Sequence, residues 1–310
     1  MSNYTSLQPE ALSPEVRKYS RAVVREFGFF KSEYEDTGAT YGETHALIEL
    51  RRLGDLEVGE LGRILNIDKT GSSKLCASLQ RKGWIRFAGA GDKRKKVVRL
   101  TAAGLKVTMH VEKLADEKIR GALHELKADE REQVLNGMRF LASALKSSRA
   151  RKEFRLSPCT PADDKQIASI VKRSLKDLGF AGPGTAAADP SVNHLSTFNQ
   201  HRQCYLVAKR DGKVVGGVGI IGMKGEPDSV CELVRMFLSP EVRSTGLGQL
   251  LIETALMRAR EYGYKVCYLE TTTRMKAAQS LYERNGFVHV KKRRGNTGHF
   301  ACTVLMECRL

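Results

Sequence analysis

Several patterns that mark common classes of protein are missing from this sequence. Its seven cysteines are odd in number and form no C-x-x-C pair, which favours reduced thiols over a disulfide framework. Its seven histidines show no H-x-x-x-H spacing, so we expect no metal site. No apolar run reaches the roughly 18 residues of a membrane span, and the N-terminal residues lack the apolar segment of a signal peptide. These absences favour a cytoplasmic protein that has no contact with a membrane.

An excess of positive charge is the clearest feature of the composition. The chain has 52 Lys and Arg residues against 35 Asp and Glu residues, a formal net charge of +17. Such an excess attracts polyanions such as nucleic acid or phosphorylated cofactors, although it does not define a fold. With 310 residues, of which 41% are apolar, the chain suits two ordinary domains with separate cores.

The pattern of the sequence changes near residue 150. From about Pro14 to Arg149 it predicts mostly helices, and from Glu153 onward strand-like runs alternate with helices. The short, polar and basic segment KSSRARKEF (residues 146–154) joins the two regions. We therefore predict one domain over residues 1–150 and a second over residues 151–310.

Residues 56–84 have the pattern of a helix-turn-helix. Leu61, Ile64 and Leu65 recur at helical spacing. Asp68 is a good N-cap for a second helix, and two helices joined by a short turn are typical of this motif. The first two turns of the second helix carry polar or cationic side chains suited to a DNA major groove: Lys69, Thr70, Ser73 and Lys74.

Residues 85–104 predict a β-hairpin with a basic tip. Two β-rich arms, WIRF and KVVRLT, flank a tip that contains glycine and carries Lys93, Arg94, Lys95 and Lys96. The segment from Lys69 to Arg99 holds ten Lys and Arg residues and one acidic residue, Asp92. Such a concentrated cationic patch suits contacts with DNA phosphates.

The helix-turn-helix, a basic wing with D-x-R and the motif L-T-x-x-G together resemble the MarR family of winged-helix regulators. The matching residues are Asp92, Arg94, Leu100, Thr101 and Gly104. The resemblance implies that Arg94 probes a minor groove of double-stranded DNA while the second helix faces the major groove. It also implies a homodimer formed by the flanking amphipathic segments, here residues 14–30 and 105–145. In the alternative interpretation this half is only a dimerisation scaffold.

A glycine-containing turn follows a predicted strand in the second half. The strand CELVRMFL (residues 231–238) ends at Ser239-Pro240, and Arg243, Gly246 and Gly248 then spell R-x-x-G-x-G before an amphipathic helix. Glycines let successive N–H groups point inward, and the helix dipole adds positive potential, so the turn fits a diphosphate. This turn contains neither G-K-[ST] nor G-x-G-x-x-G, so it is neither of the two other common phosphate loops.

This turn resembles the R-x-x-G-x-G loop of the GNAT N-acetyltransferases, which holds the diphosphate of coenzyme A. Residues 277–290 (AAQSLYERNGFVHV) reproduce the A-x-x-L-Y-E-x-x-G-F pattern of the same family. Residues 205–221 predict a hairpin that turns at Asp211-Gly212, as the family requires. The resemblance covers residues 153–310. It implies a two-domain chain in which an all-α-rich winged helix-turn-helix precedes an α+β fold with a mixed central sheet.

The resemblance also implies which residues serve acetyl transfer. It assigns the binding of acetyl-CoA to Met236, Phe237, Leu238, Arg243, Ser244, Thr245, Gly246, Leu247 and Gly248. Tyr282 matches the tyrosine that protonates the departing thiolate, and Glu232 is our candidate for the base. In the competing interpretation, Tyr282 is a packing residue and Glu232 an ordinary carboxylate in a strand. Two departures stand out, because Ser244 replaces a common glycine and Met275 stands where an asparagine often binds the cofactor.

These observations predict a DNA-binding transcriptional regulator that also transfers acetyl from acetyl-CoA to an amine. The acceptor is a small molecule or a protein lysine, and it attacks directly in a ternary complex without a covalent acyl-enzyme. In one alternative, the GNAT-like half only senses acetyl-CoA or an amine ligand, for which Met275 is the single hint. In another, the protein is an acetyltransferase whose helical half is a scaffold. The residues do not specify the acceptor or the operator.

Overall fold

The computed structural model describes residues 8–89, 96–180, 182, 185, 188–295, 297–298 and 301–310. Its internal contacts divide the chain into two compact units, one ending at Glu132 and one beginning at Gln133. The predicted wing-tip residues Lys93, Arg94 and Lys95 lie outside the described residues. None of the helices formed by the described residues has both the length and the apolar composition that crossing a bilayer requires.

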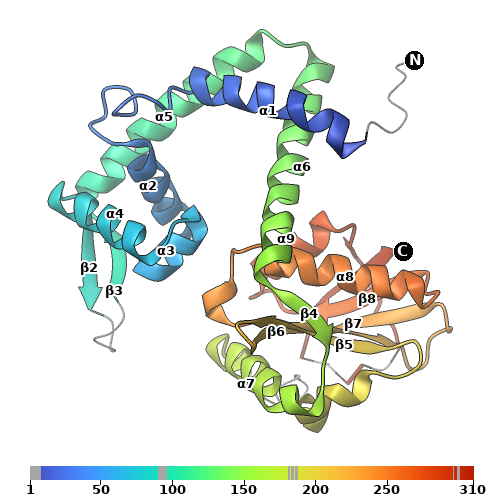
Figure 1. The fold of residues 1–310 in the computed structure, drawn as a ribbon. Helices are drawn as coiled ribbons and strands as arrows, with labels where there is room; N and C mark the ends of the chain where they lie inside the picture. Colours follow the sequence, from blue (N-terminus) through green and yellow to red (C-terminus); the bar gives the residue numbers. More distant parts are fainter. Residues whose placement is uncertain are drawn as a thin grey trace. The chain divides into compact units, whose positions relative to one another are not determined.

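The first unit contains helices and a small antiparallel sheet (Figure 1). Its helices are α1 (Pro9–Glu26), α2 (Tyr41–Leu53), α3 (Val58–Leu65), α4 (Lys69–Arg81) and α5 (Ala102–His124), and α6 (Ala128–Glu153) begins in it and continues into the second unit. Its strands are β1 (Leu56–Glu57), β2 (Ile85–Gly89) and β3 (Lys96–Leu100), in the order β1-β3-β2. This arrangement confirms the predicted helix-turn-helix followed by a hairpin.

Local hydrogen bonds account for the helix-turn-helix. Helix α3 ends at Asn66, which adopts a left-handed conformation with a φ of 57°. Asp68 then caps α4 by accepting a hydrogen bond from the N–H of Gly71 at 2.6 Å. Ser72, buried in α4, donates its hydroxyl to the carbonyl of Val58 at the start of α3 at 2.5 Å. The Ser72 hydroxyl therefore ties the first turns of α4 to the start of α3.

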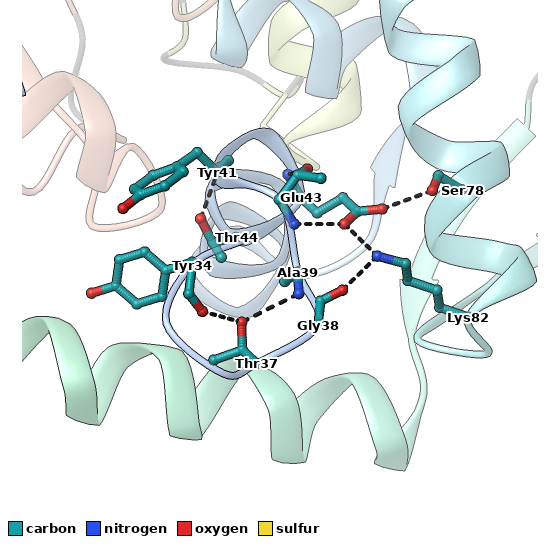
Figure 2. A network of polar contacts seen from close by, with 10 residues as sticks. Tyr34, Thr37, Gly38, Ala39, Tyr41, Glu43, Thr44, Ser78 and Lys82 are labelled. Atoms are coloured by element: carbon teal, nitrogen blue, oxygen red, sulfur yellow. Dashed lines mark hydrogen bonds and ion pairs between the residues drawn. The ribbon is translucent and has the colours of Figure 1, made fainter. Parts of the chain in front are cut away.

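A buried carboxylate connects α2 to α4, the second helix of the helix-turn-helix (Figure 2). Glu43 is 2% exposed, and it forms a capping box with Thr40 at the start of α2. It also accepts hydrogen bonds from Ser78 and from the ammonium of Lys82, each at 2.7 Å. Burial alone would raise the pKa of Glu43, but the donors Lys82, Thr40 and Ser78 together hold it below its ordinary value. The ion pair therefore fixes α4 against α2.

Replacing Glu43 by glutamine should destabilise the first unit by about 2 kcal/mol, because the ion pair to Lys82 is lost. Trp84 is the single tryptophan of the chain and lies beside Lys82, so its fluorescence reports unfolding of this unit alone. In the native protein, the stability of this unit should also depend on pH through the same ion pair. Because the folded pKa of Glu43 is lowered, its contribution is complete above the ordinary value of 4.5 and is lost as pH falls further.

The matched control for this substitution is Glu49→Gln on the same helix. Glu49 pairs with Arg52 three residues along α2, and the Arg52 side chain is exposed. Such surface pairs contribute about 0.5 kcal/mol or less. Equal destabilisation by the two substitutions would contradict the role assigned to Glu43.

The second unit is a seven-stranded mixed sheet with helices on both faces (Figure 1). Its elements are β4 (Arg155–Pro158), α7 (Pro161–Asp177), η1 (Pro190–Phe198), β5 (Cys204–Arg210), β6 (Lys213–Gly222), β7 (Val230–Leu238), η2 (Pro240–Val242), α8 (Leu247–Glu261), β8 (Val266–Thr271), α9 (Lys276–Arg284), β9 (Val288–His289) and β10 (Val304–Arg309). The strand order is β4-β5-β6-β7-β8-β10-β9, and β7 and β8 are the parallel pair. Helices α8, α9 and the end of α6 share one core, whereas α7 and η1 form another.

Helix α6 continues through most of the basic segment that the sequence places between the two domains. The segment is helical as far as Glu153. Ala150 and Phe154 are buried in the core of the second unit together with Leu247 and Leu251 of α8. The apolar side chains at positions 150 and 154 explain this packing, because they place one face of a polar segment against the sheet unit.

Candidate active site

Strands β7 and β8 pair over only three positions before they part. The paired residues run from Val230 opposite Val266 to Glu232 opposite Tyr268. Both strands continue beyond this point, β7 to Leu238 and β8 to Thr271. A pocket opens where they separate, and its walls include Glu232, Arg235, Met236, Phe237, Glu270, Thr271, Thr272, Met275 and Tyr282. Parting strands leave backbone groups that a ligand can pair with.

The turn between β7 and α8 presents unpaired backbone amides. Ser244 and Gly246 have positive φ values of 64° and 98°, with Thr245 between them in an ordinary conformation. Within the described part of the chain, none of the six N–H groups from Ser244 to Gln249 donates a hydrogen bond. Together with the positive end of the α8 dipole, these amides form a site for an anion.

The structure changes one boundary of the predicted loop. The N–H of Arg243 donates to the carbonyl of Pro240 at 3.3 Å, so this amide is already paired. The unpaired set begins at Ser244 and extends to Gln249, one residue beyond the predicted range. Thr245 and Leu247 have buried side chains in the core, so only their backbone is available to a ligand.

Four of the predicted residues meet in one pocket. Glu232, Met236, Phe237 and Tyr282 line it together, although they come from β7 and α9. Leu238 pairs with β6 at the end of β7, next to the turn. Tyr282 is 5% exposed, and burial raises its pKa well above the ordinary value, so the phenol stays protonated at neutral pH.

Glu232 has the electrostatic character of a group that exchanges protons near neutral pH. Its side chain lies at the point where β7 and β8 part, and the residue is 6% exposed. Burial, with a smaller contribution from the nearby Glu270 and against the opposing effect of Arg235, raises the pKa of Glu232 to about 8. A carboxyl group with such a pKa is suited to accept a proton from an ammonium group.

A β-bulge places Arg235 in the wall of the pocket, which the sequence analysis did not anticipate. The register between β6 and β7 shifts between Gly217 and Gly219, and Arg235 adopts a positive φ of 49°. The hydroxyl of Tyr205 donates to the carbonyl of Arg235 at 2.8 Å. Bulges of this kind redirect side chains, and they are frequent beside active sites.

The glycines of β6 make room for Tyr205. A Cβ at Gly217 would lie 2.7 Å from the Tyr205 ring, and one at Gly219 would lie 2.9 Å from it. The structure confirms the predicted hairpin and its turn at Asp211-Gly212, whereas the role of these glycines is not apparent from the sequence. The tyrosine that holds the bulge therefore depends on the glycine-rich sequence of the neighbouring strand.

The last turns of α6 pack against the amide-rich turn. A Cβ at Gly246 would lie 2.7 Å from the carbonyl oxygen of Lys146. Arg149 donates to the carbonyl of Thr245 at 3.4 Å, and Arg151 pairs with Glu253 of α8 at 3.0 Å. Position 246 is therefore restricted to glycine both by its φ and by the backbone of α6.

The parting parallel strands, the amide-rich turn and the pocket lined by Glu232 and Tyr282 are suited to an acyltransferase that uses a coenzyme A thioester. Residues 174–287 match the acetyltransferase (GNAT) family, and residues 37–95 match the MarR family. The chain belongs to the GNAT acetyltransferase family and carries a MarR-family domain in its helical half. Both sequence resemblances are thereby confirmed, as is the expected enzyme class, an acetyl-CoA-dependent acyltransferase.

Several similar proteins are acetyltransferases. The protein named "Uncharacterized N-acetyltransferase YjgM" from Escherichia coli (strain K12) is 39% identical over 149 residues, which are 47% of this chain and 89% of that protein. Human N-acetyltransferase 8 is 31% identical over 105 residues, 33% of this chain and 46% of that protein. A GNAT acetyltransferase structure from Staphylococcus aureus Mu50 has a TM-score of 0.46 at 15% identity, covering 50% of this chain and 98% of that one.

Gly246→Ala should weaken the binding of coenzyme A by at least about tenfold, because the new methyl group meets the carbonyl of Lys146 and distorts the turn. Gly263→Ala is the matched control, because Gly263 also has a positive φ, of 81°, but nothing lies within 4 Å of its Cβ. Isothermal titration with coenzyme A measures both variants. Equal affinities would show that the turn tolerates a side chain at position 246.

Proposed function

We propose that this protein transfers the acetyl group of acetyl-CoA to an amine and binds double-stranded DNA through its MarR-type domain. The observation that carries the enzymatic part is the set of six unpaired amides beside the parting of β7 and β8. The two activities would divide near residue 150, with DNA binding and dimerisation before it and acetyl transfer after it. Because a MarR-type regulator acts on DNA, the proposal places the protein in a bacterial-type cytoplasm.

The chain offers separate groups to the two ends of acetyl-CoA. The amides from Ser244 to Gln249 would hold the diphosphate, because unpaired N–H groups at a helix N-terminus favour an anion there. The backbone of β7 from Met236 to Leu238 has no β8 partner and would pair with the pantetheine arm and the acetyl carbonyl. Bound in this way, the thioester supplies an activated acetyl group.

Glu232 and Tyr282 would manage the protons of the transfer. Glu232, directly or through water, accepts a proton from the ammonium group of the acceptor, which leaves a nucleophilic amine. The amine nitrogen then bonds to the acetyl carbon while the bond from that carbon to sulfur breaks. Tyr282 donates a proton to the departing thiolate, and its raised pKa means that the phenol carries that proton at neutral pH.

The enzymatic proposal predicts release of free thiol from acetyl-CoA when the protein is incubated with a suitable amine. A panel of amino acids, polyamines, drug-like amines and lysine peptides tests activity and acceptor class together. Tyr282→Phe should lower kcat at least about tenfold, because the thiolate loses its proton donor. Binding of coenzyme A without thiol release from any amine would instead favour the alternative in which this half only senses a ligand.

The pH dependence of the same assay tests Glu232. The folded protein holds the pKa of this carboxyl near 8 rather than 4.5, so its base form accumulates only as pH rises through that value. Below pH 8 the kcat/KM for the amine should fall about tenfold per pH unit on account of Glu232. The amine's own ionisation contributes in parallel, and Glu232→Gln should retain only that contribution. Identical pH profiles would exclude Glu232 as the base.

The helical half supports the DNA-binding part of the proposal through its surface. Lys69, Thr70, Ser73 and Lys74 are all exposed on the first turns of α4. Helix α1 has no buried residue, and apolar side chains exposed on α1 and α6 include Leu12, Val16, Tyr19, Val23, Leu135, Met138, Phe140 and Leu145. These apolar side chains support a homodimer, which suits a pseudo-palindromic DNA site.

DNA affinity should fall steeply as salt rises, because cationic side chains displace counterions from the phosphates. Lys69→Ala, Lys74→Ala and Arg94→Ala should each weaken binding, and the slope of log K against log salt should drop by about 0.9 for each phosphate contact removed. Lys113→Ala on α5 removes the same charge from an exposed position outside α4 and serves as the control. A weak response independent of salt and sequence would favour the scaffold alternative.

A further inference from the structure

Arg235 is a buried cation in the wall of the pocket that opens beside Glu232. Its side chain is 5% exposed, and one terminal nitrogen bonds to the Asp189 carboxylate and, at 2.8 Å, to the Ser191 hydroxyl. The ring of Phe198 lies 5.1 Å from the guanidinium carbon. The Nε atom is also buried, and it has no hydrogen-bond partner among the described residues. A buried N–H without an acceptor is unfavourable, so a ligand that supplies one would bind there.

Several parts of the fold hold Arg235 in this position. The bulge in β7 gives the residue a left-handed backbone, and the Tyr205 hydroxyl fixes its carbonyl. Asp189 caps the start of η1, where it also binds Ser191, so the partner of the guanidinium is itself anchored. Strained backbone that the surroundings hold in place is frequent at binding sites. The orientation of Arg235 is therefore determined by three separate elements.

The charged side chains around the pocket suit a ligand that carries both an ammonium group and a carboxylate. Asp189 balances Arg235, and Arg293 pairs with Glu270 on the opposite strand. Glu232 lies close enough to Arg235 for the cation to lower the pKa of its carboxyl group. An ammonium group suits Glu232, and a carboxylate suits the planar guanidinium of Arg235, which can accommodate two oxygens.

We propose that Arg235 binds the carboxylate of the acceptor, so that the site acetylates small amines that carry a carboxylate group. This inference rests on the proposed acetyl transfer and specifies its substrate class. The acceptor ammonium loses one proton to Glu232, its nitrogen bonds to the acetyl carbon, and the carbon–sulfur bond breaks. The second proton of the amine balances the one that the thiolate takes up. The carboxylate is unchanged and serves only to orient the amine.

The experiment compares L-amino acids with their carboxamides as acceptors in the thiol-release assay. The pair differs at the carboxylate alone, and the carboxamide has the less basic amine, so more of it is unprotonated at neutral pH. The free acids should nevertheless show a kcat/KM at least about tenfold higher. Equal or better use of the carboxamides by the native protein would overturn the inference. No thiol release with any amine would instead overturn the proposed transferase activity, and this inference with it.

Arg235→Lys tests whether the guanidinium is responsible for the preference. It should raise the KM for the amino acid at least about tenfold, change the KM for acetyl-CoA little, and reduce the preference over the carboxamide. Arg274→Lys is the matched control, because Arg274 donates to the carbonyl of Leu178 and does not line the pocket. An unchanged preference in Arg235→Lys would contradict the assignment. If this variant does not bind coenzyme A, the preference of the native protein decides the question.

Discussion

The constraint on which the rest of the second unit depends is the short pairing of β7 and β8. Parallel strands normally satisfy each other's backbone groups along their length, but these two do so over three positions. The separation leaves β7 without a partner from Leu233 to Leu238 on that side. It also places Glu232 at the base of the opening and Tyr282 in its wall. In the proposed mechanism a coenzyme A thioester would provide the missing backbone partner, so that this opening in the sheet suits acyl transfer.

The amide-rich turn depends on packing as much as on its own sequence. Gly246 needs a positive φ to leave successive amides unpaired, and the carbonyl of Lys146 leaves no room for a side chain. Helix α6, which begins in the unit with the winged helix, therefore also forms one wall of the turn in the second unit. Likewise, the β-bulge at Arg235 depends on the hydroxyl of Tyr205, and Tyr205 depends on the glycines of β6. The local shape of the site is set by contacts between segments far apart in the chain.

The difference between features set by neighbouring residues and features set by distant contacts explains what could be predicted from the sequence. The helix-turn-helix, the β5–β6 hairpin and the turn before α8 each depend on neighbouring residues, such as the Asp68 cap, so their local patterns were sufficient. Glu232 and Tyr282, which line the pocket together, could be named as candidates because Glu232 begins the strand that leads to the turn and Tyr282 belongs to a contiguous motif. Arg235 and Tyr205 were missed because a bulge and a long-range hydrogen bond leave no periodic signal. The paired amide of Arg243 was also missed, since the 3-10 turn at Pro240 that engages it is not apparent from R-x-x-G-x-G.

The most direct test of this account follows the backbone amides of the turn as coenzyme A binds. Hydrogen exchange or NMR resolves individual N–H groups, and the account predicts that the six from Ser244 to Gln249 become protected or shift together. The already paired amide of Arg243 should change less and serves as the internal reference. Binding of coenzyme A that leaves those six amides unaffected would contradict the assignment of the diphosphate site and, with it, the proposed mechanism of acetyl transfer.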